Sequence, residues 1–538
     1  MVSSFRYRMA DIRRSLKEFW LEYKRYKIGL AGLALLIVLI LLAILPLIVV
    51  PEDIRNQWSE NPRWTFNPKL APPQWVNIFS REKRAPPMNL YPSKVEDLWK
   101  YVANKLFLRY KAEMNITDEE MLKKVRKMIE EAVKKDYMYR GYVYTFNYNF
   151  TWDIPSDNII LVIQGIDRRV DVSIMIIRPD NLSIAIGTDL GPSPIVIAKD
   201  VSPKLGNETF IGEPYIAISL QFNEALAKEI LNFIKNYEEP EVVEKMRSLI
   251  LKGTPSPIAL VFNRVGPGMV YRAKGVLKGT YTIVVSIEAS QQNATLTKAP
   301  NVWIRVPGSC FGLLGTDGRG RDNVVTIMLG SQLALLVGLT YGVAVVFLGL
   351  IYGVISAYAG GIVDEVMQRI NEIVYSLPVL PFLILFSYYI REVWGVQPNI
   401  WHIVFLLLIF GWTSTAIIVR SMALSIKEQP YIEAARAIGA GNLRIVFKHI
   451  MPQLIPYTFA AIALAVPGAI LMEAGLSFLG LTDPSMPSWG RMLSEAQESM
   501  FAWWWIIPPG LMITITGLAF VFIGNALDTI LNPRLRRF

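Results

Sequence analysis

The residue types that carry most enzyme chemistry are scarce in this chain. Its 538 residues include two histidines, His402 and His449, and one cysteine, Cys310. A disulfide needs two cysteines and a structural zinc site takes about four Cys or His ligands, so neither forms from this chain alone. Residues 51–309 contain no histidine or cysteine, which excludes Ser-His-Asp and Cys-His catalysis there. We therefore expect no catalytic, cofactor-binding or metal-binding residues.

A segment in the C-terminal half has the residue types of a docking surface. Residues 429–452 read QPYIEAARAIGAGNLRIVFKHIMP. Pro430 is typical of a first helical turn and Gly439 of a helix end, so the segment predicts two short helices separated by a glycine turn. The first helix carries small and charged residues, namely Glu433, Ala434, Ala435 and Arg436. Small side chains let a partner approach the backbone closely, which favours insertion into a groove of another protein.

Charge is distributed unevenly along the chain. Charged residues make up 19% of the whole, compared with about 25% in soluble domains. Residues 51–309 carry 63 charged side chains in 259 positions, whereas residues 310–538 carry 26 in 229. This contrast predicts a soluble domain inserted into a membrane protein. The chain lacks the phosphate-binding pattern G-x-x-x-x-G-K-[ST], so any ATP hydrolysis is expected on another subunit.

Long apolar stretches predict an all-α membrane bundle of six transmembrane helices, because a span needs about 20 mostly apolar residues. The six stretches are Ile28–Pro51, Asn323–Val363, Ile373–Ile390, Val393–Val419, His449–Met472 and Ser499–Leu527. The first, at 28–51, is interpreted as a retained signal anchor. The second is too long for one span, so we expect it to begin with an interfacial or tilted helix. Trp503, Trp504 and Trp505 are expected to anchor the last span in lipid.

Basic residues near the spans predict the orientation. The tail at 1–27 carries 8 basic and 3 acidic residues, and the loop at 421–455 carries 4 and 2. We place both segments and the C-terminus in the cytoplasm. Residues 52–309 then lie outside the cell, and residues 310–538 form a core of five helices. The net charge of +10 then reflects orientation in a lipid bilayer, and no nucleic-acid partner is expected. Five N-x-[ST] sequons all fall in the external segment, at Asn115, Asn149, Asn181, Asn207 and Asn293.

The external segment is expected to form an α+β domain. Residues 61–92, rich in Pro and Trp, are interpreted as an extended tether, and Thr117 with Glu120 predicts a capping box that starts a charged helix. Further helices are expected at 222–237 and 241–251, and strands at 137–152, 159–165, 169–177, 182–187, 258–262 and 280–288. The charged residues 167–169 are interpreted as a solvated turn.

Residues 429–452 resemble the EAA loop of ABC-importer permeases, with E-A-A, then Gly439, and His449 and Pro452 in an H-x-x-P element. More narrowly, the chain resembles the C-type permease subunit of dipeptide and oligopeptide importers. Three further stretches carry this resemblance: Gly315–Asp322 (GTDGRGRD), the pair 473–480 and 487–493 (EAGLSFLG and PSWGRML), and 532–536 (NPRLR). The family's first external loop is normally far shorter than the 259 residues found here.

The resemblance implies a subunit that is not itself an enzyme and contains no cofactor. ATP hydrolysis would come in trans from two cytoplasmic ATPase subunits, with Glu433, Ala434, Ala435, Arg436 and Gly439 forming the coupling surface. It also implies a second, homologous permease subunit and an extracytoplasmic solute-binding protein. Peptides are the favoured cargo, with oligosaccharides or a nickel chelate as alternatives. A different class of protein, a membrane-anchored ectoenzyme or sensor, is also considered, because carboxylate-only glycosidase chemistry needs no His or Cys.

Three other sets of residues are candidates for specific roles. Gly338, Gly342, Gly349 and Gly353 fall on one face of the second span, where small residues permit close helix packing. Glu473 is an ionisable residue near the outer membrane surface, and is expected either to function there or to be solvated or hydrogen-bonded. The external-mouth residues are Gly315, Thr316, Asp317, Arg321 and Asp322, and we expect them to hold the loop in place rather than bind substrate.

Overall fold

The computed structural model describes residues 18–114, 118–138, 140–165, 170–186, 195–197, 204–205, 208–209, 215–221, 224–251, 255–272, 275–289, 296, 298–396 and 399–531. The chain divides into two compact units. The membrane unit comprises residues 1–61 and 323–538, and the inserted unit comprises residues 62–322. The sequence predicts an inserted segment at 52–309, so both ends of the compact unit lie later in the chain than predicted.

In its described residues the membrane unit consists of helices, and five of these helices are long and apolar enough to cross a bilayer. Their spans are Lys27–Val49, Asn323–Ala359, Ile400–Lys427, Asn442–Phe478 and Trp503–Ile530. The corresponding helices are α2 (Lys27–Ile44) with α3 (Pro46–Val49), α11 (Asn323–Ala359), α14 (Ile400–Lys427), α17 (Met451–Phe478) and α19 (Trp503–Leu531). The first span is followed by the short helix α4 (Glu52–Asn56).

The predicted span at 373–390 falls on a bent pair of helices rather than on one straight helix. Helix α12 (Gly361–Ser376) and helix α13 (Val379–Glu392) meet at a 76° bend. The two helices form a sixth span only if together they make one crossing of the bilayer. The break has a local cause, since a proline disfavours the helical conformation of the residue before it. Leu377, which precedes Pro378, is extended with ψ 134°.

Two other membrane predictions need correction. Helix α11 is one continuous helix of 37 residues, so no separate interfacial helix precedes it. At 1.5 Å per residue it is about 55 Å long, well over the ~30 Å hydrocarbon thickness. Of the three tryptophans that begin α19, Trp504 and Trp505 are buried within the protein, and Trp503 is the exposed one. The prediction that all three anchor in lipid is therefore wrong for two of them.

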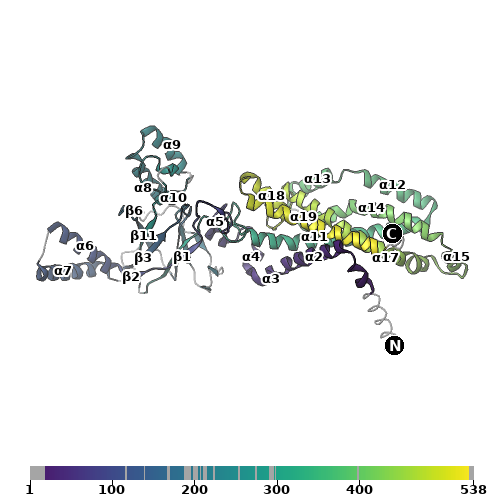
Figure 1. The fold of residues 1–538 in the computed structure, drawn as a ribbon, viewed down its shortest axis with the longest axis horizontal. Coiled ribbons are helices and arrows are strands. Elements are labelled where there is room, and N and C mark those ends of the chain that lie inside the picture. Colours follow the sequence, from purple (N-terminus) through teal and green to yellow (C-terminus); the bar gives the residue numbers. More distant parts are fainter. Residues whose placement is uncertain are drawn as a thin grey trace, which may run out of the picture. The chain divides into compact units, whose positions relative to one another are not determined.

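Helix α11 lies between α14 and α17, while α19 packs against α17 and α2 (Figure 1). The glycines of α11 lie at these contacts. A Cβ atom added at Gly338 would come within 2.7 Å of Val466 on α17, and one at Gly353 within 2.6 Å of the Ala416 carbonyl oxygen on α14. Gly342 and Gly349 face α17 and α14 in the same way. The four glycines thus serve two different neighbours.

The described part of the inserted unit forms two five-stranded antiparallel sheets, with strand orders β1-β12-β4-β10-β7 and β2-β3-β11-β5-β6. The strands of the first sheet are β1 (Met88–Leu90), β12 (Asn301–Val306), β4 (Ile160–Gln164), β10 (Tyr215–Ser219) and β7 (Ile195–Ile197). Those of the second are β2 (Lys94–Asp97), β3 (Gly141–Phe150), β11 (Gly279–Ala289), β5 (Val170–Ile177) and β6 (Ser183–Ile186). A short ribbon joins β8 (Lys204–Leu205) to β9 (Glu208–Thr209).

The inner faces of both sheets share one apolar core with three helices. These helices are α8 (Glu224–Lys235), α9 (Pro240–Leu251) and α10 (Pro257–Val261). Helices α6 (Leu98–Met114) and α7 (Glu119–Tyr137) pair with each other, and α6 also contacts β2 and β3 (Figure 1). The turn between β5 and β6 matches the predicted Pro-Asp-Asn turn, with Asn181 at φ 63°.

Several predictions for the inserted unit fail for identifiable reasons. Residues 258–262 form most of helix α10 rather than a strand, because a short buried apolar run fits either element and Pro257 begins a helical turn. The predicted tether at 61–92 is folded: it includes the 3₁₀ turn η1 (Pro62–Phe66) and helix α5 (Val76–Phe79), and buries Trp64 and Phe66. Asp118 caps α7, whereas Thr117 and the turn at 167–169 lie outside the described residues.

The glycine contacts of α11 predict the effect of a single added methyl group. Gly353→Ala should lower the melting temperature of the purified protein, because overpacking costs about 1–3 kcal/mol. The matched control is Gly468→Ala in α17, where a Cβ atom meets nothing within 4 Å among the described residues. The control should be neutral or slightly stabilising. Equal melting temperatures for the two variants, measured by thermal unfolding in detergent, would contradict the packing role of Gly353.

Candidate functional site

The segment at 429–452 folds as the predicted helical hairpin. Helix α15 (Pro430–Ala437) starts with proline, and helix α16 (Asn442–Ile445) follows after a glycine turn. Gly439 has φ +84°, its N–H donates to the Arg436 carbonyl (2.9 Å), and the Ala440 N–H donates to the Ala435 carbonyl (3.0 Å). This bonding pattern is a Schellman motif, which satisfies carbonyl groups at the end of α15. We call residues 430–445 the hairpin.

The hairpin exposes most of the residues singled out in the sequence, with one exception. Glu433, Ala434, Arg436 and Gly439 are exposed, and so is Pro452, which lies in the first turn of α17; His449 is half-buried. Ala435 is only 6% exposed and shares the buried face of α15 with Ile432. The expectation that Ala435 belongs to the docking surface is therefore at odds with its position, because every helix on a surface must bury one face.

Exposed apolar side chains of the hairpin region were not singled out in the sequence. Ile438 is 86% exposed, Leu443 is 74% exposed and Phe447, in the π-helical turn Val446–Ile450, is 62% exposed. Large apolar residues that stay exposed next to one another mark interaction surfaces. Ile438 follows α15 directly, Leu443 lies within α16 and Phe447 lies in the turn after α16, so the available signal was the position of large apolar residues in a segment of short helices.

One aromatic side chain ties the hairpin to the rest of the membrane unit. The ring of Tyr358, at the end of α11, has the Arg436 guanidinium 5.6 Å and the Lys427 ammonium 5.8 Å from its centre. Its hydroxyl donates to the side chain of Asn442 (2.8 Å). Lys427 also donates to the Ala357 and Tyr358 carbonyls, as expected for a cation at a helix C-terminus. Tyr358 thereby contacts α14, α15 and α16.

A second polar network lies nearby on α11, α12 and α14. Arg420 makes a two-pronged ion pair with Asp364, with Nε–Oδ1 2.7 Å and Nη2–Oδ2 2.5 Å. The Ser356 hydroxyl donates to the same carboxylate and accepts from Gln368. Bidentate pairs fix orientation as well as adding energy, so Asp364 sets the position of α12 against α14. Sequence reasoning missed this pair because its members are 56 residues apart.

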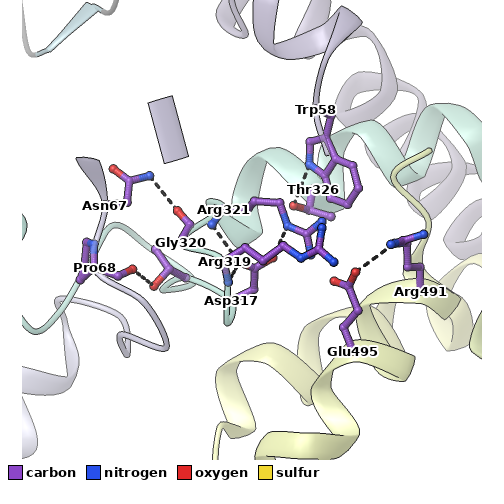
Figure 2. A network of polar contacts seen from close by, with 11 residues as sticks. Trp58, Asn67, Pro68, Asp317, Arg319, Gly320, Arg321, Thr326, Arg491 and Glu495 are labelled. Carbon is purple, nitrogen blue, oxygen red and sulfur yellow. Dashed lines mark hydrogen bonds and ion pairs between the residues drawn. The ribbon is translucent and has the colours of Figure 1, made fainter. Parts of the chain in front are cut away.

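The external-mouth element at Gly315–Asp322 binds an earlier segment of the inserted unit (Figure 2). The buried Thr316 hydroxyl donates to the Pro68 carbonyl (2.6 Å) and accepts from the Ala71 N–H (3.0 Å). The Asn67 side chain donates to the Gly320 carbonyl (3.0 Å). Residues 67–71 and 315–322 are thus fastened together.

Asp317 organises the same element from within. Its carboxylate accepts from the N–H groups of Arg319 (2.9 Å) and Arg321 (2.8 Å) and pairs with the Arg321 guanidinium (Figure 2). Asp317 and Arg321 are both buried, and Gly315 and Gly320 have positive φ, which the tight turns require. Thr316 and Asp322 form an isolated antiparallel bridge. These contacts fit the expected structural role.

Glu473 is buried in α17, with 3% of its surface exposed. The Ser477 hydroxyl donates to its carboxylate (2.6 Å), and Ser488 also hydrogen-bonds to it. Glu473 is therefore buried and hydrogen-bonded rather than solvated, and a functional role for this carboxylate stays a prediction. The neighbouring helix α18 (Trp489–Ala496) packs tightly here, since a Cβ atom at Gly490 would lie 2.1 Å from the Ala474 carbonyl oxygen.

Comparisons with known proteins identify what these elements belong to. A family described as binding-protein-dependent transport system inner membrane component matches residues 346–537, and the N-terminal TM domain of oligopeptide transport permease C matches residues 15–73. The oligopeptide transport system permease protein OppC of Haemophilus influenzae is 37% identical over 42% of this chain and 71% of its own length. The dipeptide transport system permease protein DppC of Bacillus subtilis is 34% identical over 43% and 72%.

A putative peptide transport system permease protein of Brucella suis is 35% identical over 52% of this chain and 93% of its own length. Among solved structures, a chain of the MetNI methionine ABC transporter in inward-facing conformations covers 39% of this chain and 97% of its own, with 19% identity and a TM-score of 0.33. The apolar helices, the hairpin and the family matches define a multi-pass membrane permease. The chain belongs to the family of C-type permease subunits of oligopeptide and dipeptide ABC importers.

The fastening of the external-mouth element predicts local opening when one hydroxyl is lost. Thr316→Val would leave the Ala71 N–H and Pro68 carbonyl without their side-chain partner, and an orphaned buried group costs about 1–3 kcal/mol. Hydrogen–deuterium exchange of residues 68–72 should therefore accelerate about tenfold or more in the full-length protein. The control Thr65→Val removes an exposed hydroxyl that donates to the Pro62 carbonyl. Unchanged exchange in Thr316→Val would show that Thr316 does not hold this segment.

Proposed function

We propose that the chain forms one half of the translocation path of an ATP-driven importer for di- and oligopeptides. The observation that carries the proposal is the exposed hairpin on a bundle of apolar helices, in a family whose relatives are described as oligopeptide and dipeptide permeases. ATP hydrolysis belongs to separate subunits in this family, and the chain supplies a route through the membrane rather than a reaction. The alternative cargo is an oligosaccharide. Uptake of a labelled peptide by the complete transporter would decide in favour of peptides.

In this proposal the hairpin is the coupling element. The exposed residues Glu433, Ala434, Arg436 and Gly439, joined by the apolar Ile438, dock in a groove of a cytoplasmic ATPase. ATP-driven closure of two ATPases pulls on the hairpin and moves the permease between inward- and outward-facing states. Tyr358 passes this movement to α11 and α14, because it contacts the hairpin and the ends of both helices.

The remaining partners are a second, homologous permease subunit, two ATPase subunits and an extracytoplasmic solute-binding protein. Support for the second permease comes from α12 and α13, which present many apolar side chains away from the described chain, among them Ile362, Ile373, Leu385 and Tyr388. The helices of a second permease subunit, together with lipid, would cover this apolar surface.

The proposed topology has six spans, with both termini and the hairpin in the cytoplasm and the inserted α+β unit outside the cell. The bent pair α12–α13 is one of these spans. Support comes from the excess of basic residues in the tail and in the loop at 421–455. Asn149 and Asn181, the two sequon asparagines among the described residues, are both exposed.

The single cysteine permits a direct test of this orientation. Cys310 is buried, and burial raises the pKa of its thiol, so it should react slowly with maleimides. A cysteine introduced at the exposed Tyr271 (Y271C) should react with a membrane-impermeant maleimide in intact cells. One introduced at Ile438 (I438C) should react only after permeabilisation. Labelling in the reverse order would overturn the proposed topology, and the unaltered protein reports the background from Cys310.

The coupling role predicts a specific defect for Gly439→Asp. The exposed turn has room for the new side chain, since a Cβ atom at Gly439 meets nothing within 4 Å in the described part of the chain. The added charge and the strain of an aspartate at positive φ would nevertheless disturb the docking surface. The variant should insert in the membrane normally, while ATP hydrolysis by the complete transporter no longer drives uptake. The control is Gly275→Asp. Gly275 also has a positive φ, +72°, and open space around an added Cβ atom, but it lies in the inserted unit, away from the hairpin sequence. Normal uptake by Gly439→Asp would refute the assignment.

A further inference from the structure

A small polar pocket lies in the membrane unit at a place to which no role has been given. Its volume is about 270 Å³, which is near the lower end of the range for small-ligand sites. It is lined by Arg391, Ser477, Gly480, Thr482, Pro484, Arg491, Ser494 and Glu495. These residues come from the end of α13, the end of α17, the loop after it and helix α18.

Three of the eight lining residues belong to the paired stretches 473–480 and 487–493, whose function the coupling mechanism leaves unexplained. Ser477 and Gly480 belong to the first stretch and Arg491 to the second. The buried Glu473 lies one helical turn before Ser477 and holds its hydroxyl by a hydrogen bond, while Ser477 also hydrogen-bonds to Thr482 (2.9 Å). The hydroxyl groups of Ser477 and Thr482 are therefore held in fixed positions.

The charges of the pocket suit a carboxylate. The lining includes two arginines, three hydroxyl-bearing residues and one acidic residue, Glu495, which pairs with Arg491 (3.0 Å). Arg491 is thereby held rigidly, whereas the side chain of Arg391 is 52% exposed and pairs only loosely with its neighbour Glu392 (3.2 Å). A planar guanidinium matches a carboxylate with two parallel hydrogen bonds, which gives both affinity and orientation.

The pocket and the hairpin lie at opposite ends of the membrane unit. Helix α17 begins beside the hairpin and ends at Phe478, next to the pocket, and its 28 residues span about 42 Å. Figure 1 likewise shows α15 and α18 at opposite ends of the bundle. If the hairpin is cytoplasmic, the pocket is at the outer end, where arriving cargo first meets the permease.

We propose that this pocket binds the C-terminal carboxylate of the peptide cargo, with Arg391 as the mobile contact and Arg491 as the fixed one. The proposal rests on the proposed function and names the part of the peptide that the membrane unit recognises. The volume admits the end of a peptide, one or two residues, and leaves the rest of the chain outside the pocket. Recognition of an end shared by all peptides would suit a permease that accepts many sequences.

The test uses the complete transporter, with its partner permease, ATPases and solute-binding protein, reconstituted in liposomes. Uptake of one labelled tripeptide is compared in two forms, with a free C-terminal carboxylate and with a C-terminal amide. For the unaltered transporter, KM should be lower for the free acid. Arg391→Gln should raise KM for the free acid about tenfold and leave that for the amide unchanged. Arg391 is exposed, so its loss should not disturb folding.

Arg369→Gln provides the matched control, since Arg369 is an exposed arginine on α12 that pairs with Glu372 (2.8 Å). It should leave both KM values unchanged. An equal effect of Arg391→Gln on the KM values of both peptide forms would overturn the proposal. An effect that changes with the anionic lipid content of the liposomes would also overturn it, because the arginine would then bind a lipid headgroup. If the unaltered transporter takes up neither peptide, the peptide function itself fails, and the pocket proposal with it.

Discussion

Close contact between α11 and its two neighbours is the constraint on which the membrane unit depends. Helices surrounded by lipid gain little from burying apolar surface, so they associate mainly through dispersion contacts, which require close approach. Glycines at four positions let the backbone of α11 approach α17 at one end and α14 at the other. The last turn of α11 then carries Ser356 and Tyr358 to the polar contacts that hold α12 and the hairpin. The packed glycines lie 5 to 20 residues before Tyr358, so close packing along α11 positions the residue that contacts the hairpin.

Two acidic side chains of the membrane unit lie next to hydrogen-bonding partners. Asp364 meets Arg420 and Ser356, and Glu473 meets two serine hydroxyls. A charged group without such partners costs several kcal/mol at this depth, so each network fixes the helices that contribute to it. The two networks lie toward opposite ends of the unit, one near the hairpin and one near α18.

The sequence predicted local structure well where local chemistry decides it. The hairpin follows from Pro430 and Gly439, because proline and glycine have strong positional preferences. The strand at 258–262 was wrong because a short apolar run has no period that separates helix from strand. The burial of Ala435, the contacts of Tyr358 and the pair of Asp364 with Arg420 depend on helices distant in the chain, which composition and spacing do not reveal. The bend at Leu377–Pro378 was within reach, since the proline was visible and its effect on the preceding residue is general.

The fastening of residues 67–71 to residues 315–320 closes the inserted unit at its base. The chain therefore leaves and returns at one place, although about 245 residues lie between the two segments. A domain whose ends are held side by side occupies the same attachment points as a short loop would. Ends held in this way allow the segment between them to be replaced by a shorter or longer one without moving either end. The permease core and its attached domain are consequently free to diverge at different rates.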